Sequence, residues 1–126
     1  MDRSLILIVD DDEGGRESLA EFLRRSNFRV LTAREGSEGL ALARQYWPKL
    51  ILLDLEMPTM DGFAFRAAQR ADRDIHAVPV VMMSGRIDLP AIAEKLGAHG
   101  SLPKPVDFSQ VLATIADVQP VRPSDR

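Results

Sequence analysis

The chain has 126 residues, of which 45% are hydrophobic, a net charge of −3 and no cysteine. This length suits one domain with its own hydrophobic core, and the lack of cysteine excludes disulfides and thiolate metal sites. The mild acidity gives no electrostatic signal for direct nucleic-acid binding, and no apolar run reaches the length of a membrane span. With no secretory signal at the amino-terminal end, we expect a cytoplasmic protein.

Short apolar runs alternate with helical periodicities along the chain. The unbroken runs at residues 5–9 and 50–53 are typical of strands buried on both faces, whereas Arg29 interrupts the run at 28–33, as suits an edge strand. In chain order we expect a strand at 5–9, a helix that contains Leu19 and Leu23 and ends near Asn27, a strand at 28–33, a helix at 38–46, a strand at 50–53, a helix at 63–71, a strand at 78–83, a helix at 90–96, a strand around 101–102 and a helix at 108–116.

These five strand–helix units predict an α/β fold. We expect a single doubly wound, five-stranded parallel sheet of the flavodoxin-like type, in the order 2-1-3-4-5 and flanked by five helices. The domain should cover residues 4–118, with 119–126 as a carboxyl-terminal tail or the start of a linker. In this strand order the first and third strands are neighbours, and ligands bind beyond their carboxyl ends.

Acidic residues follow both of these strands. Asp10, Asp11 and Asp12 come directly after the first strand, and Asp54 comes directly after the third. Two carboxylates about 4 Å apart repel by roughly 4 kcal/mol at an effective dielectric constant of 20. Such a cluster needs either a cation or raised pKa values, and its oxygen ligands suit Mg²⁺.

Two further strand ends add groups that phosphate chemistry uses. Ser84 follows the fourth strand and precedes Gly85, and Lys104 stands just beyond the fifth strand, before Pro105. Each residue alone has an ordinary explanation, as a turn former or as a solvated lysine. Together with the carboxylates, a hydroxyl donor and an ammonium group would complete one site.

The segments IVDDD, LLDLEMPTMDG, MMSG and KP together resemble the receiver domain of two-component response regulators. The resemblance implies that Asp54 accepts a phosphoryl group from a histidine kinase or a histidine phosphotransfer protein. It also implies a Mg²⁺ ion bound directly by Asp11, Asp54 and the backbone carbonyl of Glu56, with Asp10 acting through water. Asp12 falls outside this ligand set.

The same resemblance assigns roles to the remaining site residues. Ser84 would bond a phosphoryl oxygen, Lys104 would pair with the phosphoryl group, and the Lys104–Pro105 peptide would be cis. The domain would be a signalling switch that catalyses only its own Mg²⁺-dependent phosphorylation and dephosphorylation. Two departures concern output: Ser101 stands where relatives usually carry an aromatic residue, and the Ser84–Lys104 interval is short.

Arg86 and Glu56 occupy two variable positions that, in this family, flank the phosphoryl group and tune its hydrolysis. A direct Arg86–Glu56 ion pair is one arrangement that these positions allow. The sequence leaves open the downstream protein effector and whether two copies form a homodimer.

Three other functions were weighed against this one. A receiver-like module that binds partners without phosphorylation would have the same fold, but it usually lacks one of the key residues. A phosphohydrolase with an aspartyl-phosphate intermediate is a more remote alternative, because the acidic motif follows the third strand rather than the first. In a flavin carrier, the acids at 10–13 would repel the phosphate of the flavin.

Overall fold

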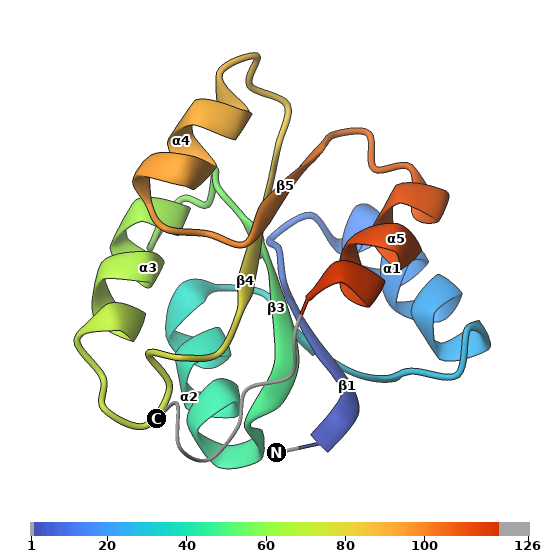
Figure 1. Ribbon diagram of the computed structural model, residues 1–126, viewed down its shortest axis with the longest axis horizontal. Helices are drawn as coiled ribbons and strands as arrows, with labels where there is room; N and C mark the ends of the chain where they lie inside the picture. The colour runs from blue at the N-terminus through green and yellow to red at the C-terminus, as the bar shows by residue number, and fades with distance from the viewer. Residues whose placement is uncertain (1, 119–126) are drawn as a thin grey trace.

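The fold is a parallel sheet of five strands in the order β2-β1-β3-β4-β5, as the sequence predicts (Figure 1). The computed structural model describes residues 2–118, and the predicted tail at 119–126 lies outside the described residues. The elements are β1 (Asp2–Val9), α1 (Glu13–Arg25), β2 (Arg29–Ala33), α2 (Gly36–Tyr46), β3 (Pro48–Asp54), α3 (Gly62–Arg70), β4 (Val80–Ser84), α4 (Leu89–Lys95), β5 (Gly100–Pro103) and α5 (Phe108–Asp117).

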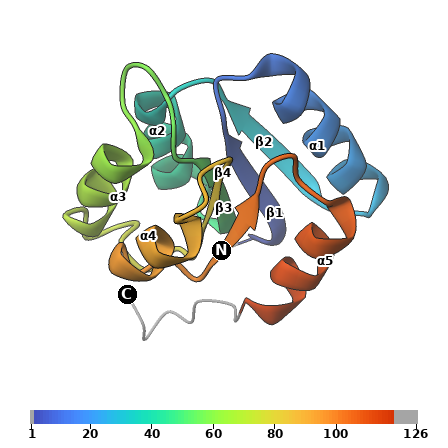
Figure 2. The ribbon, with the colours of Figure 1, turned by 90° about the horizontal axis from the view of Figure 1, so that it is seen from above.

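Helices cover both faces of the sheet. Figure 2 shows α1 and α5 on one side and α2, α3 and α4 on the other. Successive side chains of a strand point to opposite faces, so Ile6 and Ile8 of β1 pack with α1 and α5. Leu7 and Val9 pack with the three remaining helices. The unbroken apolar runs therefore form a strand with two buried faces.

Several boundaries differ from the expected ones by one or two residues. α2 ends at Tyr46 as expected, where Trp47 adopts a left-handed conformation (φ 48°), but it starts at Gly36 rather than at residue 38, and β3 starts at Pro48 rather than at residue 50. β4 starts at Val80 rather than at residue 78 and includes Ser84. The later start follows from a turn, because the Val78 N–H donates to the carbonyl of Ile75.

Three aspartates fix the starts of helices at the carboxyl end of the sheet. The side chains of Asp12, Asp61 and Asp107 accept hydrogen bonds from the first-turn N–H groups of α1, α3 and α5. A carboxylate at this position satisfies free N–H groups and interacts favourably with the helix dipole. Asp12 thus has a structural role as the N-cap of α1, and its exclusion from the Mg²⁺ ligand set stays a prediction.

Within residues 2–118, none of the helices combines the length and the apolar character that crossing a bilayer requires.

Candidate functional site

Three carboxylates meet at the carboxyl ends of β1 and β3. Val9 pairs with Leu53 in the sheet, and this register brings the next residues, Asp10 and Asp54, side by side. One carboxylate oxygen from each of Asp10, Asp11 and Asp54 lies within 4.8 Å of the others. Asp10 is only 4% exposed and Asp54 only 2% exposed, whereas Asp11 is open to solvent. The predicted acidic cluster is therefore formed.

Backbone groups orient the two buried carboxylates. The Asp12 N–H donates to Asp10 Oδ1 at 2.9 Å, and the Glu56 N–H donates to Asp54 Oδ1 at 3.2 Å. The buried guanidinium of Arg16 on α1 donates to the Asp10 carbonyl at 3.0 Å. Arg16 was not predicted from the sequence as a site residue, because a single arginine on a helix resembles any solvated charge.

Lys104 is the cation of the site. Its Nζ lies 3.1 Å from Asp10 Oδ2 and 3.3 Å from Asp54 Oδ1. Its backbone N–H donates to the carbonyl of Ser84 at 2.9 Å, and the Lys104–Pro105 peptide is cis, as the resemblance implies. Burial favours the neutral amine, but the bonds and charges of the two aspartates outweigh burial and raise the pKa of Lys104.

Charge is not balanced around Asp54. Burial, followed by the charge of Asp10, raises the pKa of Asp54 from 3.8 to about 7, because Lys104 only partly offsets these two effects. A low-polarity site with more carboxylates than cations favours either a proton or a bound cation. The cluster of oxygen ligands without sulfur or imidazole suits a hard ion such as Mg²⁺.

Ser84 lies at the same edge of the sheet, but its hydroxyl is already used. The residue is fully buried, and Oγ donates to the carboxylate of Glu56, at 2.6 Å from Oε1 and 2.9 Å from Oε2. The Arg86 N–H donates to Ser84 Oγ at 3.0 Å. The Glu56–Ser84 hydrogen bond could not be predicted from the sequence, because no local pattern links residues that are 28 positions apart.

The Arg86–Glu56 ion pair considered from the sequence is replaced by another pair. Arg86 Nε and one terminal nitrogen bind the two carboxylate oxygens of Asp88, at 2.9 and 3.0 Å. Asp88 is only two residues away along the exposed β4–α4 loop, so this pairing costs little chain entropy.

The role of the Glu56 carbonyl as a Mg²⁺ ligand stays a prediction.

A cavity of about 500 Å³ opens beside the acidic cluster, between α1 and the β5–α5 connection. Asp10, Lys104 and Phe108 are among the residues that line it. Of the three clustered aspartates, Asp10 lines this cavity and Asp11 is open to solvent, whereas Asp54 is buried and does not line it.

Comparisons with known proteins agree with this geometry. A family model described as "Response regulator receiver domain" matches residues 6–116. The chain is 35% identical over 112 residues to Protein PilH of Pseudomonas aeruginosa, covering 87% of this chain and 93% of PilH. It is 38% identical over 113 residues to the transcriptional regulatory protein PrrA of Mycobacterium tuberculosis, where the match covers 87% of this chain and only 47% of PrrA. The structure of the chemotaxis protein CheY4 of Vibrio cholerae matches with a TM-score of 0.84 and 30% identity, over 92% of this chain and 98% of CheY4.

Proposed function

The chain belongs to the response regulator receiver domain family, and from that premise we propose that Asp54 is its phosphoacceptor. The chain is a phosphoaccepting receiver domain of two-component systems, and its family is a signalling family rather than a classical enzyme family. Neither the phosphorylation-independent module nor the phosphohydrolase is favoured. The observation that carries the proposal is the juxtaposition of buried Asp54 with a second buried carboxylate and one lysine.

The proposed donor is a phosphohistidine of a histidine kinase or of a phosphotransfer protein. An oxygen of Asp54 attacks the phosphorus, a P–O bond forms, and the P–N bond breaks with its electron pair left on the imidazole nitrogen. If the other ring nitrogen carries a proton, the imidazole leaves as the neutral ring. If it does not, the leaving nitrogen takes a proton from solvent. Lys104 stands 3.3 Å from the attacking carboxylate, where its charge stabilises the transferred oxygens.

Mg²⁺ is the proposed cofactor. Asp11 and Asp54 would hold it with their carboxylates, together with the backbone carbonyl of Glu56, and Asp10 would act through water. The close approach of three carboxylate oxygens and the raised pKa of Asp54 support this assignment. When bound, the ion supplies neutralisation of the negative charge on the phosphoryl oxygens. Lys104 and the backbone N–H of Glu56 then orient the acceptor carboxylate.

The finer parts of the function are also proposals. The chain would speed only its own phosphorylation and dephosphorylation, would act in the cytoplasm, and would pass its signal to a protein partner. PrrA is named a transcriptional regulatory protein, and this chain spans about half of its length. DNA binding is therefore not assigned to this chain.

The proposal is tested by intact-mass spectrometry after incubation with acetyl phosphate and Mg²⁺. We expect the parent to gain one phosphoryl group, and we expect no gain without Mg²⁺ or in Asp54→Ala. Asp74→Ala is the matched control, because Asp74 is an exposed aspartate remote from the cluster. A parent that gains nothing from either acetyl phosphate or a phosphohistidine donor would overturn the proposal, as would an Asp54→Ala variant that is phosphorylated like the parent.

A further inference from the structure

The Ser84 hydroxyl carries a single proton, and the Glu56 carboxylate accepts the hydrogen bond that this proton makes. A serine hydroxyl can donate one hydrogen bond, and here that bond goes to both oxygens of the Glu56 carboxylate. The 2.6 Å distance is in the range of charge-assisted O–H···O⁻ bonds, which are about twice as strong as neutral ones. Ser84 therefore cannot donate to a phosphoryl group while this bond persists.

Glu56 also contacts the acceptor residue. Its backbone N–H donates to Asp54 Oδ1, and its side chain turns the other way, to Ser84 on β4. One residue thus bridges the acceptor carboxylate on β3 and the hydroxyl on the neighbouring strand. A phosphoryl group on Asp54 would add negative charge beside the Glu56 carboxylate, and like charges repel.

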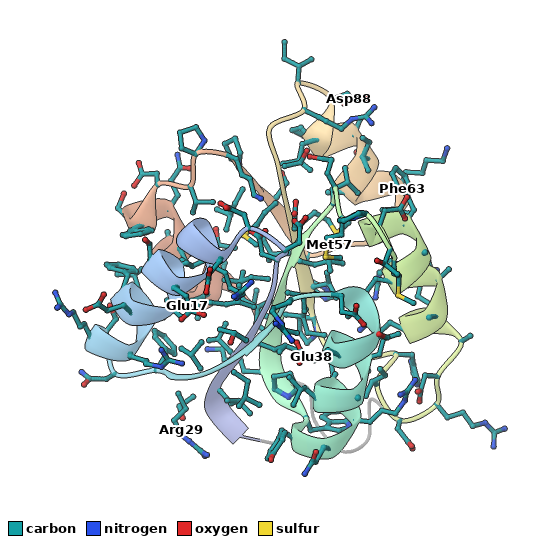
Figure 3. All side chains as sticks on the ribbon, turned by 180° about the vertical axis from the view of Figure 1, so that it is seen from behind. Glu17, Arg29, Glu38, Met57, Phe63 and Asp88 are labelled. Atoms are coloured by element: carbon teal, nitrogen blue, oxygen red, sulfur yellow. The ribbon has the colours of Figure 1, made fainter. Side chains whose placement is uncertain are left out.

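Release of Glu56 requires no disruption of the core. Glu56 is exposed, so its carboxylate can turn into solvent, while Ser84 is fully buried and fixed within β4. An open groove of about 460 Å³ adjoins Glu56 and is lined by Arg86 as well. Met57 and Phe63 also line the groove, and Figure 3 shows Phe63 on α3 and Asp88 on the β4–α4 loop. The groove offers the Glu56 carboxylate space once it leaves Ser84, while Arg86 stays paired with Asp88.

On these grounds we propose that Glu56 is an autoinhibitory latch that keeps the Ser84 hydroxyl away from Asp54 until Asp54 is phosphorylated. This inference rests on the proposed function of Asp54. The phosphoryl oxygens compete with the Glu56 carboxylate for the one proton of Ser84. Because the Arg86 N–H is bonded to Ser84 Oγ, rotation of the hydroxyl toward the phosphoryl group also moves the start of the β4–α4 loop.

The latch is tested by comparing backbone amide signals of Gly85 and Arg86 by NMR in free and phosphorylated protein. We expect the free Glu56→Ala variant to move these signals along the line from the parent's free position toward its phosphorylated position, because the competing acceptor is gone. Loss of one charge-assisted bond should change the ratio of latched to released protein by about tenfold. Glu56→Gln should move them less, because an amide oxygen still accepts, though more weakly.

Glu94→Gln is the control for loss of one negative charge, since Glu94 is exposed on α4 away from Ser84. Its signals at Gly85 and Arg86 should stay at the parent's positions. Intact mass of the same samples reports phosphorylation separately. Phosphorylated parent with unmoved Glu56→Ala signals, or equal movement in Glu94→Gln, overturns the latch and leaves the proposed function standing. A parent that gains no phosphoryl group overturns the proposed function, and the latch with it.

Discussion

Two buried polar clusters in this domain differ in how completely their polar groups are paired. At the carboxyl end of the sheet, Asp10 and Asp54 share Lys104, and burial, followed by the charge of Asp10, raises the pKa of Asp54 to about 7 because the one lysine only partly offsets them. Between α3 and the end of α4, Arg66 and Gln69 are also buried, but their hydrogen bonds end on oxygens that need a donor. We call this second cluster the α3 brace.

The α3 brace links three segments. Arg66 donates to Gln69 Oε1 at 2.7 Å and to two carbonyls at the end of α4, and Gln69 donates to two carbonyls of the turn before β4. The four carbonyls are those of Leu96, Gly97, Ile75 and Val78. Buried carbonyls without partners would cost free energy, so these bonds stabilise the fold.

The contrast separates groups kept for stability from groups kept for chemistry. A network such as the α3 brace makes the fold rigid when all its buried donors and acceptors are hydrogen-bonded. Unbalanced charge at Asp54 lowers stability, and it suits a site that binds a cation and a phosphoryl group. Substitutions in the two clusters should therefore change stability in opposite directions.

The largest effect is expected for Asp54→Asn in metal-free protein. An acid whose pKa is raised in the folded state binds its proton more tightly there, so parent stability falls as pH rises from about 4 through about 7. The variant has no such loss, because its amide does not titrate. The displacement from 3.8 to about 7 corresponds to at most about 4 kcal/mol. Urea unfolding in EDTA should show the variant more stable than the parent at pH 8 and nearly equal to it at pH 4; equal stability at pH 8 would contradict a raised pKa of Asp54.

The opposite sign is expected in the α3 brace. Gln69→Ala removes one of the three acceptors of Arg66 and the amide that donates to the carbonyls of Ile75 and Val78, of which Ile75 keeps the Val78 N–H. We expect the free energy of unfolding to fall by about 3 kcal/mol. Urea unfolding at neutral pH measures it, with Gln110→Ala on the exposed side of α5 as the control. A loss no larger than that of the control would show that the brace is not a stabilising network.

Mg²⁺ should stabilise the acidic site and so reduce the stability difference between the parent and Asp54→Asn. A ligand that binds only the folded state at about ten times its dissociation constant adds about 1.4 kcal/mol. Thermal unfolding of the parent should therefore shift upward with MgCl₂ but not with NaCl at equal ionic strength. The gain should largely disappear in Asp54→Asn and persist in Gln69→Ala. An equal gain in the parent and in Asp54→Asn would place the ion elsewhere.

The smallest effect is expected for Arg86→Ala. Its ion pair with Asp88 lies in solvent, where such pairs contribute little to stability because water screens the charges. The unfolding midpoint should stay within experimental error of the parent's. A clear loss of stability would mean that Arg86 belongs to the buried site rather than to its exposed rim.

The site residues that could be predicted from the sequence are those whose position follows from the strand order. Alternation of apolar runs and helices predicted the strand order, and the strand order predicted that Asp10 and Asp54 would meet. Lys104 was placed correctly for the same reason, because it follows β5, the strand next to β4. These inferences need only the direction of each strand.

Contacts between side chains from distant segments were not predictable in this way. The Glu56 carboxylate accepts a hydrogen bond from Ser84 rather than pairing with Arg86, because the rotamer of an exposed glutamate depends on the folded surroundings. Arg66 and Gln69 looked like ordinary helix residues, and their burial follows from how α4 ends against α3. The starts of α2, α3 and α4 lie one or two residues before the expected positions.

The most direct test of the central claim is to locate the phosphoryl group chemically. Borohydride reduces an aspartyl phosphate to homoserine, so the parent is incubated with Mg²⁺ and acetyl phosphate, reduced, digested and sequenced by tandem mass spectrometry. The account predicts conversion at position 54 and not at Asp10, Asp11 or Asp61. Conversion at another aspartate, or a phosphate ester on a hydroxyl residue in place of any conversion, would contradict it.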